Sequence, residues 1–189
     1  MKSYKQHWLI VAFAALTLSL HAQDKQFTKT GKIYFDATTE ASPENVEAVN
    51  KSVICVMDTK TGNIQFSLLV KGFEFQRALM QEHFNENYLE SDKYPKSDFK
   101  GVITNNKDVI YTQDGDYKVN VKGILTIHGV SKEVETNGKL VIKNGKISIQ
   151  SDFPVELASY KISIPGIVAD KVAKTAKIKL TCPLEPLIK

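Results

Sequence analysis

The sequence lacks the short motifs by which most enzymes are recognised. It has no P-loop, no GxGxxG, no GxSxG and no HExxH. Its two cysteines, Cys55 and Cys182, form no CxxC pair. After residue 22 the only histidines are His83 and His128, and neither has the spacing of a metal ligand. We therefore expect no enzyme activity, no cofactor and no metal; a hydrolase without a known motif would have to depend on His83 or His128.

Long apolar runs are also absent except at the N-terminus. Lys2 and Lys5 precede an apolar stretch over 9–20, and polar sequence returns with His21. This order is typical of a secretory signal peptide, and the run is shorter than the ~20 residues that span a bilayer. We predict a signal peptide over 1–22, a mature domain over 23–189 and no stable membrane anchor.

The mature sequence has little net charge. Removing Lys2 and Lys5 lowers the formal charge from +4 to +2, without the basic excess that marks nucleic-acid-binding proteins. We expect no nucleic-acid partner. Export would place Cys55 and Cys182 in an oxidising compartment, where they could form one disulfide; the alternative is two buried thiols that act as small apolar side chains. We predict that these two cysteines lie close enough to pair.

Strand patterns dominate the mature sequence. The longest alternation of apolar and polar residues runs over 117–127. Asn144-Gly145 predicts a two-residue type I′ hairpin turn. We also predict a hairpin turn at Asn105-Asn106 and a bulge at Asn137-Gly138. The strands expected from the same reasoning are 32–36, 53–57, 64–70, 99–104, 108–113, 117–127, 134–142, 147–153, 160–164 and 176–182.

Two segments show helical patterns instead. Leu79, Met80, Phe84 and Tyr88 recur at near-helical spacing, which predicts an amphipathic helix over 77–90. The stretch 42–49 begins with a serine, continues with proline and has early acids, which predicts a short second helix.

Many antiparallel strands with few helices indicate an up-and-down barrel or a sandwich, and the long strand 117–127 favours the barrel. The amphipathic helix must bury its stripe against a sheet or in a barrel mouth. A barrel of eight strands either packs solid or holds one small ligand, and the residues alone leave both open. The candidate ligand-binding residues are those on inward strand faces or near the helix, namely Phe66, Phe75, Met80, Phe84, Tyr88, Val121, Leu125, Ile127 and Phe153.

Two motifs resemble the YceI-like family. The first comprises Met80-Gln81-Glu82-His83-Phe84-Asn85, then Tyr88-Leu89-Glu90-Ser91-Asp92-Lys93-Tyr94-Pro95, then Phe99-Lys100-Gly101. The second is Gly123-Ile124-Leu125-Thr126-Ile127-His128-Gly129-Val130-Ser131-Lys132. A third family segment, Arg-x-Asp-Phe-Gly, is altered here to Gln150-Ser151-Asp152-Phe153-Pro154.

The resemblance implies a lipocalin-like antiparallel barrel that is exported to the periplasm. It also implies a ligand held inside the barrel: a polyisoprenoid, an isoprenoid quinone or another lipid. The alternative is a structural or interaction protein of the envelope whose barrel is filled by its own side chains. Whether the protein forms a homodimer is left open by the sequence.

Overall fold

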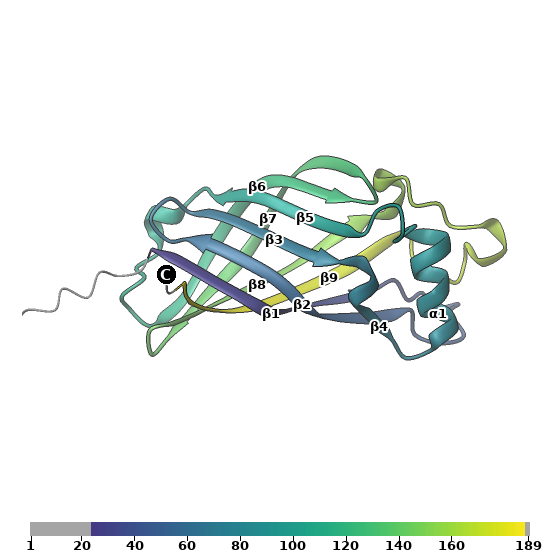
Figure 1. The fold of residues 1–189 in the computed structure, drawn as a ribbon, viewed down its shortest axis with the longest axis horizontal. Coiled ribbons are helices and arrows are strands. Elements are labelled where there is room, and N and C mark those ends of the chain that lie inside the picture. The colour runs from purple at the N-terminus through teal and green to yellow at the C-terminus, as the bar shows by residue number, and fades with distance from the viewer. Residues whose placement is uncertain (1–23, 188–189) are drawn as a thin grey trace, which may run out of the picture.

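The computed structural model describes residues 24–187, in which nine antiparallel strands curve into a barrel with a helix at one end (Figure 1). The mainly β, barrel-type fold predicted from the sequence is confirmed. The strands are β1 (Lys25–Asp36), β2 (Glu47–Asp58), β3 (Asn63–Leu69), β4 (Phe73–Phe75), β5 (Lys96–Ile103), β6 (Gly115–Ile127), β7 (Val130–Lys143), β8 (Lys146–Glu156) and β9 (Thr175–Pro186).

Eight of these strands close the barrel. They follow one another in the order β1-β9-β8-β7-β6-β5-β3-β2, and β2 pairs with β1 to complete the circle. The short β4 pairs with the start of β2, beyond the end of β3, so β3 and β4 behave as one strand broken at residues 70–72. The first and last strands of the sequence are therefore neighbours in the sheet.

Alternating side chains fill the barrel as expected for a sheet with one buried face. Along β6, Val119 is buried and Val121 half-buried, while Lys118 and Lys122 are exposed. The same alternation on β8 turns Ile147 and Ile149 inward. These inward residues belong to one continuous apolar core that includes residues from every barrel strand.

One seam of the barrel is only partly paired. The β7–β8 ladder runs from Lys143↔Lys146 to Lys139↔Gln150 and stops there. Beyond it, β7 remains paired with β6 down to Val130, and β8 remains paired with β9 up to Glu156. The two strands therefore diverge, each held by its outer neighbour.

The β6–β7 and β7–β8 hairpin turns both contain residues with positive φ. Asn144 and Gly145 have φ of 51° and 72°, which confirms the predicted type I′ turn. His128 and Gly129 make an equivalent turn between β6 and β7, with φ of 50° and 71°. A Cβ on Gly129 would approach the Tyr94 ring to 2.5 Å, so glycine is required there on two grounds.

The predicted strand 108–113 and the hairpin at Asn105-Asn106 are wrong. The chain between β5 and β6 makes a short 3-10 turn at Asn106–Asp108 and then an irregular segment, and β5 pairs with β6 directly. The Asn106 side chain donates to the Thr59 carbonyl and accepts from the Tyr111 hydroxyl. Segment 104–114 is thereby drawn across the end of the barrel opposite the helix.

The short helix predicted over 42–49 is also wrong. The Ser42 hydroxyl does not cap a helix; it accepts from the Thr39 amide and donates to the Lys171 carbonyl. β2 already begins at Glu47, and Ala48 pairs with Phe35 of β1. Tertiary pairing therefore overrides the local helical signal.

Two further strand details differ from the expectation. The register of β6 with β7 is unbroken at Asn137 and Gly138, so no bulge occurs there; the irregularity lies in β1, between Thr28 and Gly31. Residues 160–164 are not a strand, because a 3-10 turn at Leu157–Tyr160 and the positive φ of Lys161 (59°) lead into a loop. The apolar alternation there comes from loop side chains that pack into the core.

The helix predicted over 77–90 is present over 78–88. It consists of α1 (Ala78–His83) and a π-helical turn over Phe84–Tyr88, in which the Leu89 amide donates to the Phe84 carbonyl. Phe84 is buried, and Met80 and Tyr88 are half-buried, in agreement with the predicted stripe. Leu79 was expected in the stripe but is 61 % exposed.

Cys55 and Cys182 lie side by side as free thiols, both fully buried. They come from β2 and β9, which flank β1, and Gly31 of β1 packs against Cys182: a Cβ there would approach the Cys182 Sγ to 2.4 Å. A hydrogen bond with Cys182 and burial raise the pKa of the Cys55 thiol. Cys55 and Cys182 are therefore close together, as predicted, and both are reduced thiols.

The Asn144-Gly145 turn gives the first testable prediction. We expect Gly145→Val to lower the free energy of unfolding by about 1–3 kcal/mol, because a β-branched residue is strained at positive φ. Gly166→Val is the matched control: both sites have open space around the added side chain, and Gly166 does not have a positive φ. Chemical denaturation of both variants measures the difference, and equal losses would contradict this origin of the strain.

Candidate functional site

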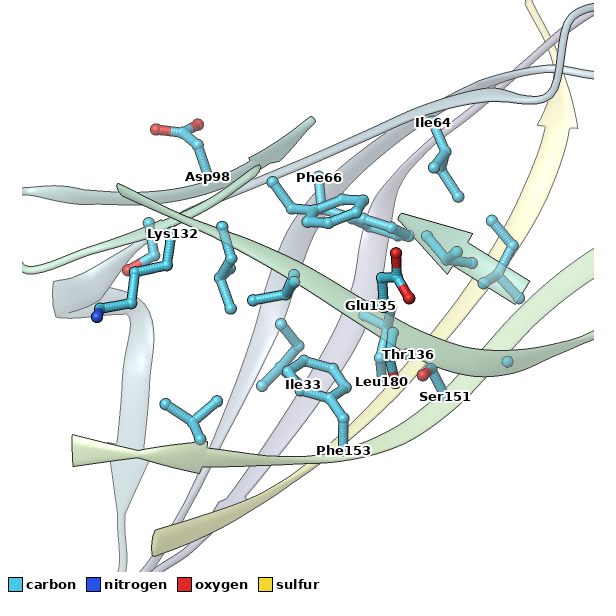
Figure 2. A pocket seen from close by; sticks show the side chains of 18 of the residues that line it. Ile33, Ile64, Phe66, Asp98, Lys132, Glu135, Thr136, Ser151, Phe153 and Leu180 are labelled. Carbon is cyan, nitrogen blue, oxygen red and sulfur yellow. The ribbon is translucent and has the colours of Figure 1, made fainter. Parts of the chain in front are cut away.

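A cavity of about 390 Å³ lies inside the barrel. Most of its wall is apolar and comes from strands on opposite sides, as Figure 2 shows for Ile33, Phe66, Phe153 and Leu180. Polar residues line it on β3 and β5 (Ser67, Ser97 and Asp98) and where β7 and β8 diverge. The volume is within the range of roughly 300–1,000 Å³ that small-molecule sites occupy.

Four of the nine sequence-predicted site residues line this cavity: Phe66 on β3, Val121 and Leu125 on β6, and Phe153 on β8. All four face the cavity, and two of them are linked across neighbouring strands: Phe66 pairs with Phe99, which in turn pairs with Leu125. The rings of Phe66 and Phe99 lie 6.0 Å apart.

Four others lie together elsewhere. Phe75, Met80, Phe84 and Tyr88 line a second cavity of about 200 Å³ between the helix and the loop that precedes β9. Phe84 packs against three other phenylalanines, with ring centroids 5.6 Å from Phe35, 5.3 Å from Phe73 and 4.9 Å from Phe75. This aromatic cluster closes the helix end of the barrel. Ile127 packs against the core but lines neither cavity.

Sequence reasoning missed the lining contributed by β7 and by the segment after β8. Val134, Thr136 and Gly138 share the inward face of β7 with the buried Leu140 and line the large cavity. The alternation that identified strand 134–142 already carried this signal. Tyr160 also lines the cavity; it lies in a 3-10 turn at the start of the segment predicted as strand 160–164, and it was not among the predicted site residues.

A histidine joins three separate segments beside the large cavity. His128 Nδ1 donates to the Tyr160 carbonyl at 3.1 Å, and His128 Nε2 lies 2.7 Å from the Glu90 carboxylate. The Tyr94 ring packs edge-on against the imidazole, with centroids 4.6 Å apart. The hydrogen bond from His128 holds the pKa of Glu90 below its usual value. We call Glu90, Tyr94, His128 and Tyr160 the histidine latch.

Within residues 24–187, no group of three or more His, Cys, Asp and Glu side chains is arranged to hold a metal ion. In the same part of the chain, no helix has both the length and the apolar character to cross a bilayer. The predicted signal peptide over 1–22 lies outside the described residues.

The fold is therefore that of a small closed β-barrel with an apolar internal cavity and a helix across one end. The YceI-like domain model matches residues 11–183, and the chain therefore belongs to the YceI-like family. No curated protein matches the sequence.

Solved structures share the fold at low sequence identity. A polyisoprenoid-binding domain from Saccharophagus degradans has a TM-score of 0.75 at 12% identity, over 87% of this chain and 99% of that one. BcnA from Burkholderia cenocepacia has a TM-score of 0.66 at 16% identity, over 82% of this chain and 96% of that one.

The histidine latch predicts a pH dependence of stability. Because the folded-state pKa of Glu90 is lowered from 4.5, its contribution is fully present above that pH and is lost as the pH falls through the lowered pKa. We expect Glu90→Gln to lower the thermal unfolding midpoint at neutral pH and to weaken the midpoint's fall in acid.

The control is Glu86→Gln, since Glu86 is an exposed acid of the same segment. Thermal unfolding from neutral pH to about pH 3 compares the two variants with the wild type, in a range that covers carboxyl titration. Identical profiles for the two variants would show that the latch does not stabilise the fold.

Proposed function

We propose that this protein binds a lipid with a long apolar chain, of the polyisoprenoid type, inside its barrel. The observation that carries the proposal is the large cavity, whose wall is mostly apolar, with polar residues only on β3 and β5 and at the β7–β8 divergence. Burying each CH₂ contributes roughly 0.8 kcal/mol, so a chain of a few isoprene units gains enough to offset the entropy of ordering it.

The cavity distinguishes this proposal from a purely structural role. An envelope protein with a filled barrel would need inward side chains large enough to occupy the interior. Here two of the positions that line the cavity carry small residues: Gly138 on β7 and Ser151 on β8. An empty apolar space of this size costs packing energy unless a ligand fills it.

Family membership supports the same class of ligand, and one relative of the same fold is described as polyisoprenoid-binding. The ligand would be a polyisoprenoid, an isoprenoid quinone or a similar lipid. We place the protein in the periplasm on the strength of the signal-like N-terminal sequence. We assign it a binding role, with no catalytic step.

The direct experiment is mass spectrometry of lipid extracted from the purified protein. It is followed by titration of the delipidated protein with geranylgeraniol, monitored by tyrosine fluorescence. The mature chain has no tryptophan, because the single tryptophan of the sequence is Trp8, so tyrosine reports without interference. Absence of both co-purified lipid and saturable binding would reject the carrier function.

A matched pair of variants tests whether the cavity is the site. We expect Leu125→Asp to abolish geranylgeraniol binding, because it places an unpaired charge on the apolar wall, and to cost stability. Ile124→Asp is the control: it is the adjacent residue on β6, points outward and is 46% exposed. Binding retained by a folded Leu125→Asp protein would show that the ligand lies elsewhere.

A further inference from the structure

The wall of the barrel has an opening where β7 and β8 diverge. If the register of the paired end continued, Glu135 would face Pro154 and Thr136 would face Phe153. These pairs are not formed, yet all four residues line the large cavity. Figure 2 shows the two strands adjacent at Thr136 and Ser151 and separated at Lys132 and Phe153. We call this gap between residues 130–138 and 151–156 the window.

The window is bounded at both ends. Near the paired ladder, the Ser151 hydroxyl donates to the Asn137 carbonyl at 2.7 Å. At the far end, the histidine latch spans the gap, since His128 of the β6–β7 turn donates to the carbonyl of Tyr160 after β8. The window therefore has a side-chain hydrogen bond across the gap at each of its two ends.

The two ends of the barrel are closed by contrast. The aromatic cluster around Phe84 closes the helix end, and no residue of 77–90 lines the large cavity. At the other end, segment 104–114 is held to the β2–β3 turn by Asn106 and to the β7–β8 turn by Asp114, which accepts from the Asn144 amide at 2.9 Å. Of these three places, only the window leaves strand edges apart beside the cavity.

The edges of the window are unsuited to pairing with an added strand. Pro154 has no amide hydrogen to donate, and proline on an exposed strand edge prevents strand addition. Lys132, Glu133 and Glu135 place charges along the opposite edge, all of them exposed. A peptide partner that inserts as an extra strand is therefore disfavoured, whereas a flexible lipid chain needs no backbone pairing.

A buried hydrogen-bond donor lies at the far end of the window. Tyr160 is 4% exposed and lines the cavity, and its hydroxyl is not fully enclosed by the described residues, so it is accessible from the cavity. Burial raises the pKa of this phenol, which keeps its proton in place. A hydroxyl that is accessible from the cavity can hydrogen-bond to the polar end of a ligand held there.

We propose that the lipid enters and leaves through the window, and that its polar end stays there against the Tyr160 hydroxyl while its apolar chain fills the cavity. This inference rests on the lipid-binding function proposed above. It places the entrance in the side wall of the barrel and not at the end covered by the helix.

Reversible cross-linking tests the route. Glu135→Cys with Pro154→Cys places one thiol on each edge of the window, and a bis-maleimide with a cleavable disulfide then joins the edges. The native Cys55 and Cys182 are fully buried and should not react, which the treated wild type verifies. The control pair is His83→Cys with Lys171→Cys, two exposed residues that line the helix-end cavity.

The readout is release of N-phenyl-1-naphthylamine, an uncharged fluorescent probe, chased by excess geranylgeraniol. Cross-linking the window should slow release roughly tenfold or more, because it raises the barrier to exit, and cleaving the linker should restore it. The helix-end cross-link should leave release unchanged. Unslowed release with a joined window, or slowed release from the helix-end cross-link, would overturn the route.

The position of the polar end has its own test. We expect Tyr160→Phe to weaken geranylgeraniol binding roughly threefold to tenfold, the effect of losing one hydrogen bond, with unchanged affinity for the naphthylamine probe. Unchanged geranylgeraniol affinity would remove Tyr160 from the site. If neither compound binds the unmodified protein, the proposed lipid-binding function is wrong. If both compounds bind but the window cross-link does not slow release, only the proposed route is wrong.

Discussion

Closure of the sheet by backbone hydrogen bonds is the constraint on which the other features depend. Every strand needs partners for its amide and carbonyl groups, and pairing of β1 with both β2 and β9 closes the barrel, which leaves unpaired strand edges at β4 and beyond the end of the β7–β8 ladder. Closure also fixes the diameter, so that inward side chains from opposite strands cannot all meet. The cavity lies inside the closed barrel, and it is bordered by the place where β7 and β8 are not paired.

The two sequence motifs are distant in the chain but meet at one place. Glu90 and Tyr94 come from the segment after the helix, and His128 and Gly129 come from the β6–β7 turn. The histidine accounts for the polar contacts, and the glycine allows the tyrosine ring to pack on the turn. The motifs therefore specify the joint between the helix segment and the barrel wall more directly than they specify the lining of the cavity.

Much of the barrel could be predicted from the sequence because most of its strands alternate regularly and have sharp turn signals. The β6 alternation and the Asn144-Gly145 turn required no tertiary information. Two of the errors arose where a side chain bonds to a distant backbone group: Ser42 to Lys171 and Asn106 to Thr59. Local patterns cannot reveal such contacts, so segments 42–49 and 108–113 were misassigned.

The candidate site was predicted only in part for a related reason. Parity along a strand identified inward residues such as Val121 and Leu125, but not the level of the barrel at which they lie. The helix stripe was correctly placed inward, yet Phe84 belongs to the aromatic cluster that separates two cavities. The end of the β7–β8 ladder is a property of register, which no single strand encodes.

The pairing of the first strand with the last has a consequence for how the molecule is made. Partners such as Gln26 and Pro186 or Phe35 and Ile178 stand almost a whole chain apart. Contacts of such sequence separation must await loop closure over nearly the full length, which places the fold among slow, high-contact-order topologies. The barrel cannot close until β9 has been synthesised, so the apolar strands that precede it remain unclosed up to that point.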